Sequence, residues 1–577
     1  MHAPARNGVA EIAFTPPIDS DREAARRAVR LAAVCVLGVV AAGLIAIPRI
    51  SMRDYIGFSL FFEQFVRIEP APLCLVAGFA VVVLLCTRQL GSVDVELSQP
   101  RYRPWVIALG SLLVAAVVWG GITLVFHRFL LADDEYSAWF QAVIYSRGHA
   151  SAVVAPEWCR WIAALTPTSI SATPGCTWRL SYLPIHSLYN AGFIALGLDR
   201  LGGPVAAGLS VWLVASIARK VWPSRPLRAY LAALFTATST QVLFMSMTMF
   251  SMSTHLLFSL AWLWLYVDER KWSNALLPWV GVAALGVHSP FPHALLIPPF
   301  LLRYLRNRRY AFLGYVAAVY AGGLSYWYGY LARVSNESAP AFASPGATAA
   351  VAKGLFHLPT AVQSLTTGLH LALVPSWNAP LVILLMIVAM LSWDRLDTFS
   401  RDASLSVVLI IVARMLMPTP QGEGWGYRFI YDALGIIALL AAVGVERLAT
   451  ATGARTATRL IVASLAISLF VQLPLRARNV AQVISPYRNG LEWMSTLPYD
   501  VVIYPADLVN WGRQLVRNDP FLRNTPKIMS RRELTPENQA ALAATATLRQ
   551  TTISRADLIA HGLPLAPFSM GAFQIAP

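Results

Sequence analysis

The chain of 577 residues is 56% hydrophobic and only 13% charged, whereas a soluble globular domain carries about 25% charged residues. Its mean hydropathy of +0.54 excludes an ordinary soluble protein and indicates a chain that is solvated mostly by lipid. The net charge of +16 does not point to nucleic acid, because the basic residues form short clusters between apolar segments, as orientation in a membrane requires.

Thirteen apolar segments approach the roughly 20 residues that cross a bilayer core. They lie near residues 30–48, 70–87, 105–127, 204–219, 228–247, 254–267, 274–291, 293–305, 310–329, 380–393, 403–417, 430–446 and 459–475. The first segment follows a polar leader and has no convincing small-residue cleavage site, so we expect it to be retained rather than removed as a signal peptide. The fold class predicted is an all-α polytopic membrane protein of about 13 transmembrane helices.

Clusters of basic residues predict the orientation of these spans. Arginines crowd the segment before the first span, and further basic clusters occupy residues 219–228, 270–271, 303–309 and 447–459. One consistent count of crossings places every cluster on the same side, which we expect to be cytoplasmic together with an N-terminal tail of residues 1–28. Residues 183–198 are apolar, but a crossing there would put the later clusters outside. We therefore expect an interfacial or re-entrant helix in that segment, and a multi-pass protein of a bacterial inner membrane.

The same count leaves three stretches facing outward, at about 131–203, 331–378 and 476–577. The last has ordinary polarity, with a strand-like run at 501–504 and a helix-like run at 536–548. We expect residues 476–577 to form a small periplasmic α/β domain. Cys159 and Cys176 share the first outer loop and can form a disulfide there if the compartment is oxidising.

Three acids emerge directly after the third span, at Asp133, Asp134 and Glu135. The aromatic and apolar residues that follow recur at helical spacing, which predicts an amphipathic helix in the membrane interface. One interpretation is that Asp133 or Asp134 caps this helix. Three successive acids exceed what a cap requires, so we favour a general base or a metal ligand at the membrane boundary.

Two outward arginines lie among aromatic residues, Arg179 before Tyr182 and Arg428 in a glycine-rich stretch. Interfacial anchoring is one role for such arginines. The other is binding a departing phosphate, which suits a guanidinium. Four histidines also fall on outer segments, as candidate substrate or metal contacts: His186, His255, His288 and His293. We favour structural, hydrogen-bonded histidines, because two prolines break the register of a simple ligand pair between His288 and His293.

The order of these motifs resembles a known family. A span is followed by Asp134-Glu135-Tyr136 and Phe140-Gln141-Ala142, then by Tyr182-Leu183-Pro184, and late in the chain by Gly426-Tyr427-Arg428-Phe429. This order resembles the GT-C superfamily of polyprenyl-phosphate-sugar glycosyltransferases, in the bacterial branch related to protein O-mannosyltransferases and the lipid A aminoarabinose transferase. The likeness covers roughly residues 105–475. The family's acidic loop usually follows the first span, so residues 29–104 look like an added transmembrane hairpin.

The resemblance implies transfer of a sugar from a polyprenyl phosphate to a hydroxyl of a glycan, lipid or protein at the outer face. It implies Asp134 as the base, with Glu135 or a divalent cation such as Mg²⁺ or Mn²⁺ assisting. Arg179 or Tyr182 occupies the place of the family's basic residue before the proline motif, and Arg428 that of its late arginine. His288 falls where many relatives have an arginine.

Two other functions stay open at this point. A transporter or flippase of a lipid-linked sugar also needs outward acids and many helices, but the chain shows few charges at mid-membrane and no pair of broken helices repeated across two halves. A polysaccharide polymerase or ligase differs chiefly in its donor, which carries a diphosphate.

Overall fold

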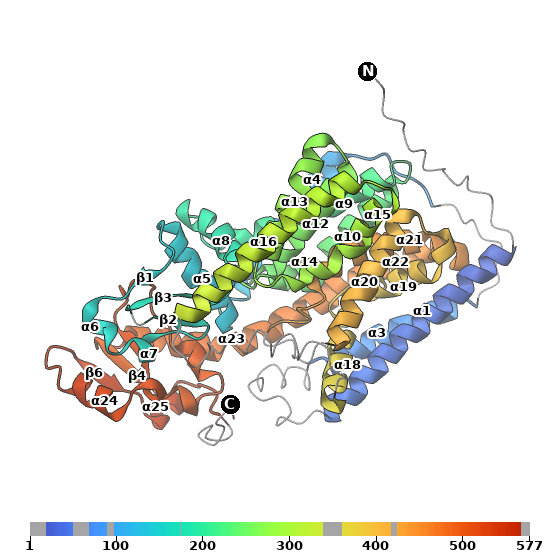
Figure 1. The fold of residues 1–577 in the computed structure, drawn as a ribbon. Helices are drawn as coiled ribbons and strands as arrows, with labels where there is room; N and C mark the ends of the chain where they lie inside the picture. The colour runs from blue at the N-terminus through green and yellow to red at the C-terminus, as the bar shows by residue number, and fades with distance from the viewer. Residues whose placement is uncertain are drawn as a thin grey trace.

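The computed structural model describes residues 19–49, 68–88, 97–173, 175–337, 360–416 and 424–566. Helices run side by side through an elongated bundle, and the short strands gather at one end of it (Figure 1). Residues 1–18 of the expected N-terminal tail and 338–359 of the second outer stretch lie outside the described ranges.

The bundle is built from helices of very different lengths. They are α4 (Pro104–Leu124), α9 (Gly202–Val221), α10 (Pro226–Ala237), α11 (Thr240–Ser246), α12 (Met252–Asp268), α13 (Lys271–Leu285), α14 (Phe291–Leu296), α15 (Pro298–Arg306), α16 (Tyr310–Glu337), α18 (Ala361–Ser376), α19 (Val382–Leu391), η2 (Trp393–Arg395), α20 (Thr398–Leu416), η3 (Tyr431–Ala433), α21 (Leu434–Thr452), α22 (Ala454–Ile467), the π turn η4 (Ser468–Gln472) and α23 (Leu473–Thr496). Each of the thirteen segments predicted to span the membrane coincides with one of these helices, with a consecutive pair, or with the N-terminal hairpin described below.

Among the described residues, five helices are long and apolar enough to cross a membrane, or six if the bent pair α10 and α11 is one span. The pair bends by 55° at its break. Several of the other predicted spans form shorter helices, such as α13 with 15 residues and α19 with 10. The chain is therefore a multi-pass membrane protein, whereas the number of thirteen crossings stays a prediction.

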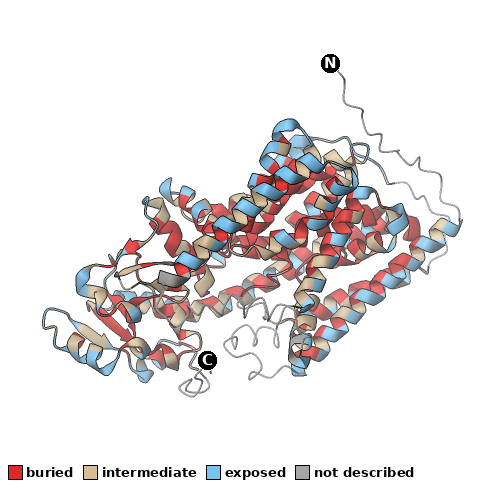
Figure 2. Cartoon of the chain, viewed as in Figure 1, coloured by how far each residue is buried: buried red, intermediate tan, exposed pale blue. Residues whose placement is uncertain are grey.

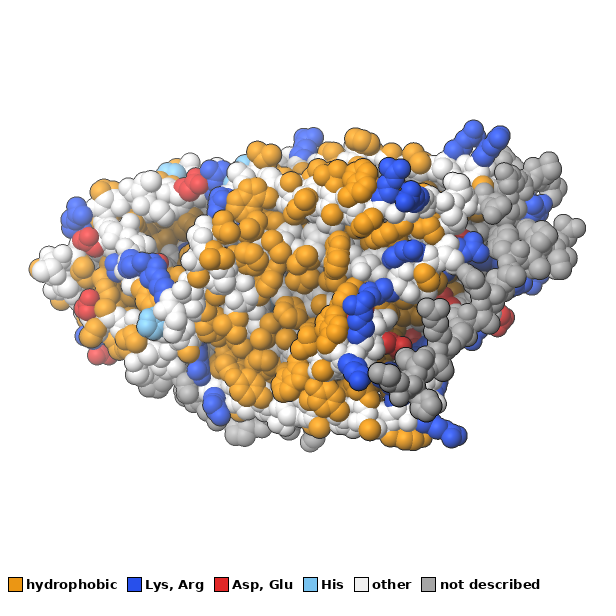
Figure 3. Space-filling model, turned by 90° about the horizontal axis from the view of Figure 1, so that it is seen from above, with side chains coloured by type: hydrophobic (Ala, Val, Ile, Leu, Met, Phe, Trp, Pro, Cys, Tyr) orange, Lys and Arg blue, Asp and Glu red, His pale blue; other side chains and the backbone are white. Residues whose placement is uncertain are grey.

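Hydrophobic side chains cover the middle of the molecule (Figure 3), between an end with many Lys and Arg side chains and an end of mixed polarity. Ion pairs join helix ends that the sequence predicts on the cytoplasmic side. Arg447 in the C-terminal part of α21 lies 3.0 Å from Asp21, and Arg228 at the start of α10 lies 2.7 Å from Glu446. These ion pairs bring the start of α1, the start of α10 and the C-terminal part of α21 close together. The count of crossings also predicts these three segments on one side of the membrane.

The core of the bundle is centred on α21, whose residues are nearly all buried (Figure 2). A helix that is apolar on every side is stable only when other helices surround it. At Gly444 an added Cβ would lie 2.1 Å from the carbonyl oxygen of Leu385 in α19. A glycine at this position therefore allows the backbones of α19 and α21 to approach each other closely.

The N-terminal hairpin consists of α1 (Asp19–Ala46), the short η1 (Ile47–Arg49) and α3 (Pro70–Cys86), and it packs directly on the bundle. Its principal neighbours are α18, α19 and α21. The helix α18 lies in the stretch 331–378 that the sequence predicts as an outer loop. Its buried Leu369, Ala372 and Leu373 explain the difference, because they form an apolar face toward α1.

The first outer loop carries a small antiparallel sheet between two helices. Its elements are α5 (Asp133–Ser146), β1 (Ala152–Val153), α6 (Pro156–Cys159), α7 (Ile162–Leu165), β2 (Ile170–Ala172), β3 (Thr177–Leu180) and α8 (Ile185–Ala195), with strand order β1-β3-β2. The helix α8 has 11 residues and at about 1.5 Å per residue cannot cross a bilayer core. The interfacial or re-entrant placement of residues 183–198 stays a prediction.

The C-terminal region contains a parallel sheet of order β5-β4-β6. Its elements are β4 (Val501–Tyr504), η5 (Ala506–Leu508), η6 (Gly512–Leu515), β5 (Lys527–Ser530), η7 (Arg531–Glu533), α24 (Pro536–Ala543), β6 (Gln550–Thr552) and α25 (Arg555–Ala560). The strand predicted at 501–504 is the buried central strand, as its continuous apolar run favours. The boundary predicted at 476 falls inside α23, because Val480, Ile484, Tyr487 and Met494 continue the buried face of that helix.

Candidate active site

The three acids after α4 occupy the first turn of α5, where successive side chains point about 100° apart around the helix axis. They therefore meet different partners. Asp133 accepts a hydrogen bond from the Ser169 hydroxyl at 3.0 Å, and Asp134 lies against Arg428. Glu135 turns back and accepts the amide N–H of Ala132 at 3.0 Å.

These contacts separate the two residues suggested as caps, because Asp133 accepts a first-turn N–H whereas Asp134 pairs with Arg428. The helix begins at Asp133, and Ala132 before it has no side chain that can accept a hydrogen bond. Glu135 instead binds the Ala132 amide, while Asp133 accepts the N–H of Asp134 at 2.9 Å. Asp134 takes no part in satisfying the helix end, so its carboxylate is available for another function.

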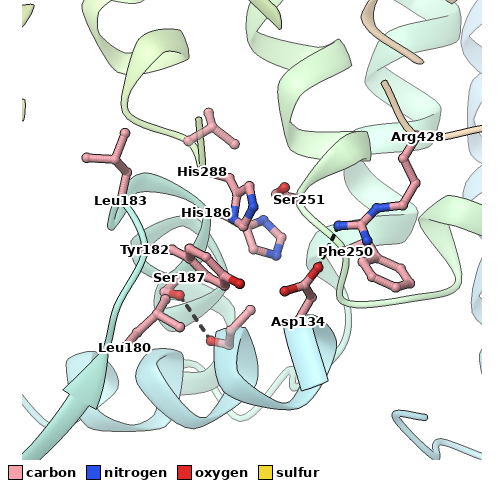
Figure 4. A pocket seen from close by; sticks show the side chains of 12 residues that line it. Asp134, Leu180, Tyr182, Leu183, His186, Ser187, Phe250, Ser251, His288 and Arg428 are labelled. Carbon is pink, nitrogen blue, oxygen red and sulfur yellow. Dashed lines mark hydrogen bonds and ion pairs between the residues drawn. The ribbon is translucent and has the colours of Figure 1, made fainter. Parts of the chain in front are cut away.

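Asp134 faces a pocket between α5, α8 and the turns that follow α11 and α13 (Figure 4). Polar lining residues from five separate stretches of sequence converge here. The lining comprises Asp134, Ala138, Leu180, Tyr182, Leu183, His186, Ser187, Phe250, Ser251, Val287, His288 and Arg428. A concave site with few, convergent polar groups is the usual form of a small-molecule site.

Arg428 reaches this pocket from the loop before η3. Its Nη2 lies 2.6 Å from Oδ2 of Asp134, its side chain is 5% exposed, and its guanidinium carbon lies 4.4 Å from the ring centroid of Phe250. Gly426, two residues earlier, has φ of +67°, and a Cβ there would lie 1.8 Å from Oε1 of Gln241. The loop that presents Arg428 thus requires glycine at position 426.

The ion pair determines the charge state of Asp134. Burial alone would raise the pKa of this carboxyl group, but the Arg428 guanidinium, with smaller contributions from His288 and Tyr182, outweighs it. The pKa of Asp134 therefore lies below its ordinary value, and the group is a carboxylate at neutral pH. An ionised carboxylate beside a buried guanidinium provides both a proton acceptor and an anion-binding group.

The pKa of Glu135 is raised, unlike that of Asp134. Burial raises its pKa to about 7, even though it accepts amide N–H groups from Ala132 and from Met249 at 3.0 and 3.3 Å. Glu135 does not line the pocket. Its two backbone contacts instead join the start of α5 to the turn between α11 and α12, which carries Phe250 and Ser251 of the pocket wall.

Of the two residues predicted at the place before the proline motif, Tyr182 lines the pocket and Arg179 does not. The ring of Tyr182 lies 4.3 Å from that of His288, and burial raises the pKa of its hydroxyl. Arg179 sits on β3, opposite Ser171 of β2, and its charge acts on Tyr145.

The four histidines divide between the pocket wall and the helices behind it. His186 and His288 line the pocket. His186 contacts the Met249 carbonyl at 2.8 Å through Nε2, which must donate, so Nδ1 accepts from the Thr254 hydroxyl at 2.9 Å. Burial lowers the pKa of His186 to about 4, so its ring is neutral. These hydrogen bonds fix the orientation of the His186 ring in the pocket wall.

His255 and His293 lie away from the pocket lining. His293 contacts the Tyr320 hydroxyl at 3.0 Å, and Nδ1 of His255 lies 4.0 Å from a carboxylate oxygen of Asp432. Within the described ranges, no group of three or more His, Cys, Asp or Glu side chains is arranged to hold a metal ion. The divergent directions of Asp133, Asp134 and Glu135 explain why these acids do not form a ligand set.

Cys159 and Cys176 form a disulfide, with Cα atoms 5.6 Å apart. It joins α6 to the turn before β3 and so closes the outer loop beside the small sheet. Cys35, Cys74 and Cys86, which the sequence places in apolar runs, are free.

Several residues that build the site were not predicted. Phe250 and Ser251 come from the turn between two expected spans. The predicted outward position of this turn was the one feature of the sequence that could have pointed to these residues. Arg517, from the C-terminal region, donates to the carbonyls of Leu130 and Leu131, just before the three acids. No local pattern marks Arg517, because its partners lie nearly four hundred residues away.

No family model matches the chain, and no curated protein matches it. The chain is similar to two solved structures. One is ArnT from Cupriavidus metallidurans in the apo state, with 12% identity and a TM-score of 0.48. The other is the same protein bound to undecaprenyl phosphate, with 14% identity and a TM-score of 0.47. Each match covers 74% of this chain and 85% of that chain.

Proposed function

We propose that this chain is a membrane glycosyltransferase that moves a sugar from a polyprenyl-phosphate donor to an acceptor hydroxyl at the periplasmic face. The observation that carries the proposal is the ionised Asp134 held 2.6 Å from the buried Arg428 in one pocket beside the interfacial helices α5 and α8. Such a pocket meets both a lipid-borne donor from the membrane and a polar acceptor from the aqueous side.

In the proposed reaction, Asp134 takes the proton of the acceptor hydroxyl while the acceptor oxygen bonds to the anomeric carbon. The bond from that carbon to the phosphate oxygen breaks, and its electron pair leaves with the polyprenyl phosphate. Arg428 binds the charge that develops on this phosphate. A single displacement of this kind inverts the anomeric configuration.

Tyr182 and His288 complete the polar wall opposite Arg428 (Figure 4), where they contact the donor headgroup in this proposal. Glu135 acts as a positioning residue, because it binds backbone amides and does not line the pocket. A diphosphate-linked donor brings more charge, whereas Arg428 is the one Lys or Arg side chain in the described pocket lining. The pocket thus favours a monophosphate donor over the donor of a polymerase or ligase.

The test is transfer by the purified protein from a polyprenyl-phospho-sugar, in wild type and in Asp134→Asn. We expect the variant to lose transfer by about 10²–10⁴-fold, the usual contribution of a general base, and to keep binding the donor. The matched control is Asp133→Asn, whose carboxylate binds Ser169. We expect it to lose less than about tenfold, because one hydrogen bond contributes about 1 kcal/mol.

Two results would contradict the proposal, and they differ. Full transfer by Asp134→Asn would show that another group is the base. A wild-type protein that binds no polyprenyl phosphate at all, while remaining folded and monodisperse, would remove the glycosyltransferase function itself. A transporter of the same lipid would bind it but would catalyse no transfer to any hydroxyl.

A further inference from the structure

Two anions need Arg428 in the proposed reaction, and the lining residues that the structure describes include no second Lys or Arg. The side chain of Arg428 is 5% exposed and that of Asp134 is 17% exposed, so water screens their interaction poorly. The remaining described lining is apolar, hydroxyl or imidazole. The donor phosphate can therefore reach a guanidinium here only by meeting the one that already holds Asp134.

A carboxylate in such a pair is a weak proton acceptor. The contact of 2.6 Å between Nη2 and Oδ2 stabilises the charged form of Asp134, and Tyr182 supports that form from the other side. A base of this strength does not deprotonate an acceptor hydroxyl effectively. The same contact that orders the pocket thus opposes catalysis by Asp134.

We propose that the donor phosphate takes Arg428 from Asp134, and that this exchange turns Asp134 from an ion-pair partner into the general base. The inference rests on the proposed function and adds the order in which the two substrates bind. The donor binds first, because its phosphate breaks the ion pair, and the acceptor hydroxyl is activated only afterwards. In the absence of donor, Arg428 keeps Asp134 in the ion pair, where it is a weak base.

The exchange predicts that removing the base strengthens binding of the lipid. In Asp134→Asn the phosphate no longer competes with a carboxylate for Arg428. We expect this variant, reconstituted in neutral lipid nanodiscs, to bind undecaprenyl phosphate about tenfold more tightly than wild type. Asp133→Asn is the matched control, since its carboxylate accepts a hydrogen bond from Ser169. We expect its dissociation constant to equal that of wild type.

A second pair of variants separates competition from simple charge repulsion. If Asp134 and the phosphate compete for Arg428, Asp134→Asn has no effect on affinity in a protein that already carries Arg428→Gln. If Asp134 merely repels the phosphate, the tightening persists in the double variant. Thermal unfolding of each variant in detergent verifies that it is folded, and Asp134→Ser replaces Asp134→Asn if the latter is not.

The outcomes distinguish this inference from the function on which it rests. Equal or weaker binding by Asp134→Asn, or tightening that persists without Arg428, overturns the exchange and leaves the glycosyltransferase proposal standing. Absence of undecaprenyl phosphate binding in both wild type and Asp134→Asn overturns both. Tighter binding that depends on Arg428 supports the exchange.

Discussion

At the scale of single residues, neighbouring acids of the same kind have different chemistry because of their surroundings. Asp134 is stabilised as a carboxylate by Arg428, whereas burial raises the pKa of Glu135 to about 7. The side chains are adjacent in sequence, yet one faces the pocket and the other faces two backbone amides. Their roles therefore follow from direction on the helix rather than from residue type.

The raised pKa of Glu135 predicts a pH dependence of stability. Its ordinary pKa is 4.5 and burial raises it to about 7, so between these values the folded protein binds a proton that the unfolded chain has released. Stability from this group is therefore present below about pH 4.5 and is lost as pH rises toward 7. A shift of this size corresponds to a free energy on the order of 3 kcal/mol.

The measurement is the melting temperature in detergent across pH 4.5 to 7.5, for wild type and Glu135→Gln. We expect the difference between the two proteins to grow in favour of Glu135→Gln as pH rises. Taking this difference cancels the contributions of other titrating groups, such as His186. A difference that does not change with pH would show that Glu135 keeps an ordinary pKa.

At the scale of elements, one buried ion pair attaches the N-terminal hairpin to the rest of the molecule. Glu69, before α3, accepts hydrogen bonds from Arg476 of α23 at 2.8 Å, from the Trp377 indole at 3.0 Å and from the Ser376 hydroxyl at 3.1 Å. The Arg476 guanidinium carbon lies 4.1 Å from the ring centroid of Trp377. The hairpin that looked like an addition is thus joined to α18 and to the helix leading to the C-terminal region.

We expect either Glu69→Gln or Arg476→Gln to destabilise the protein by about 3–5 kcal/mol, because each leaves a buried charge without its partner. The double variant should lose less than the sum of the two, since no unpaired charge remains. Unfolding in detergent followed by tryptophan fluorescence measures all three. Additive losses would mean that the two side chains act independently.

At the scale of the whole molecule, the first outer loop and the C-terminal region share one hydrophobic core. Phe140 and Trp178 from the loop pack in the same buried cluster as Val501 and Met529 from the parallel sheet. The Trp178 indole also donates to the Pro520 carbonyl at 2.7 Å. The C-terminal region therefore supports the wall of the candidate site and is not an independent appendage.

The placement of these regions predicts the result of reporter fusions. The start of α1, where Asp21 pairs with Arg447 of α21, lies at one end of the molecule and the C-terminal sheet at the other (Figure 1). Alkaline phosphatase, which is active only in the periplasm, should be active when fused after Ala566. It should be inactive when inserted at Ser224 between α9 and α10. Green fluorescent protein fusions at the same two positions are the control. Alkaline phosphatase that is active at Ser224 and inactive after Ala566 would mean that the proposed orientation is inverted.

The sequence by itself determined the features that depend on local pattern. Hydropathy predicted the membrane protein and the positions of its helices, β4 was predicted from four consecutive apolar residues, and the acids after α4 were singled out by position. These properties follow from composition and from the periods of helix and strand, which a short window of sequence contains.

Only the tertiary structure decided which charged groups meet. Asp134 pairs with Arg428, 294 residues away, whereas Arg179, only 45 positions from Asp134, does not reach the pocket. Glu69 and Arg476 are 407 residues apart, and neither carries a local signal of its partner. Such pairings depend on how helices pack and on which direction each side chain leaves its helix, and no single segment of sequence contains that information.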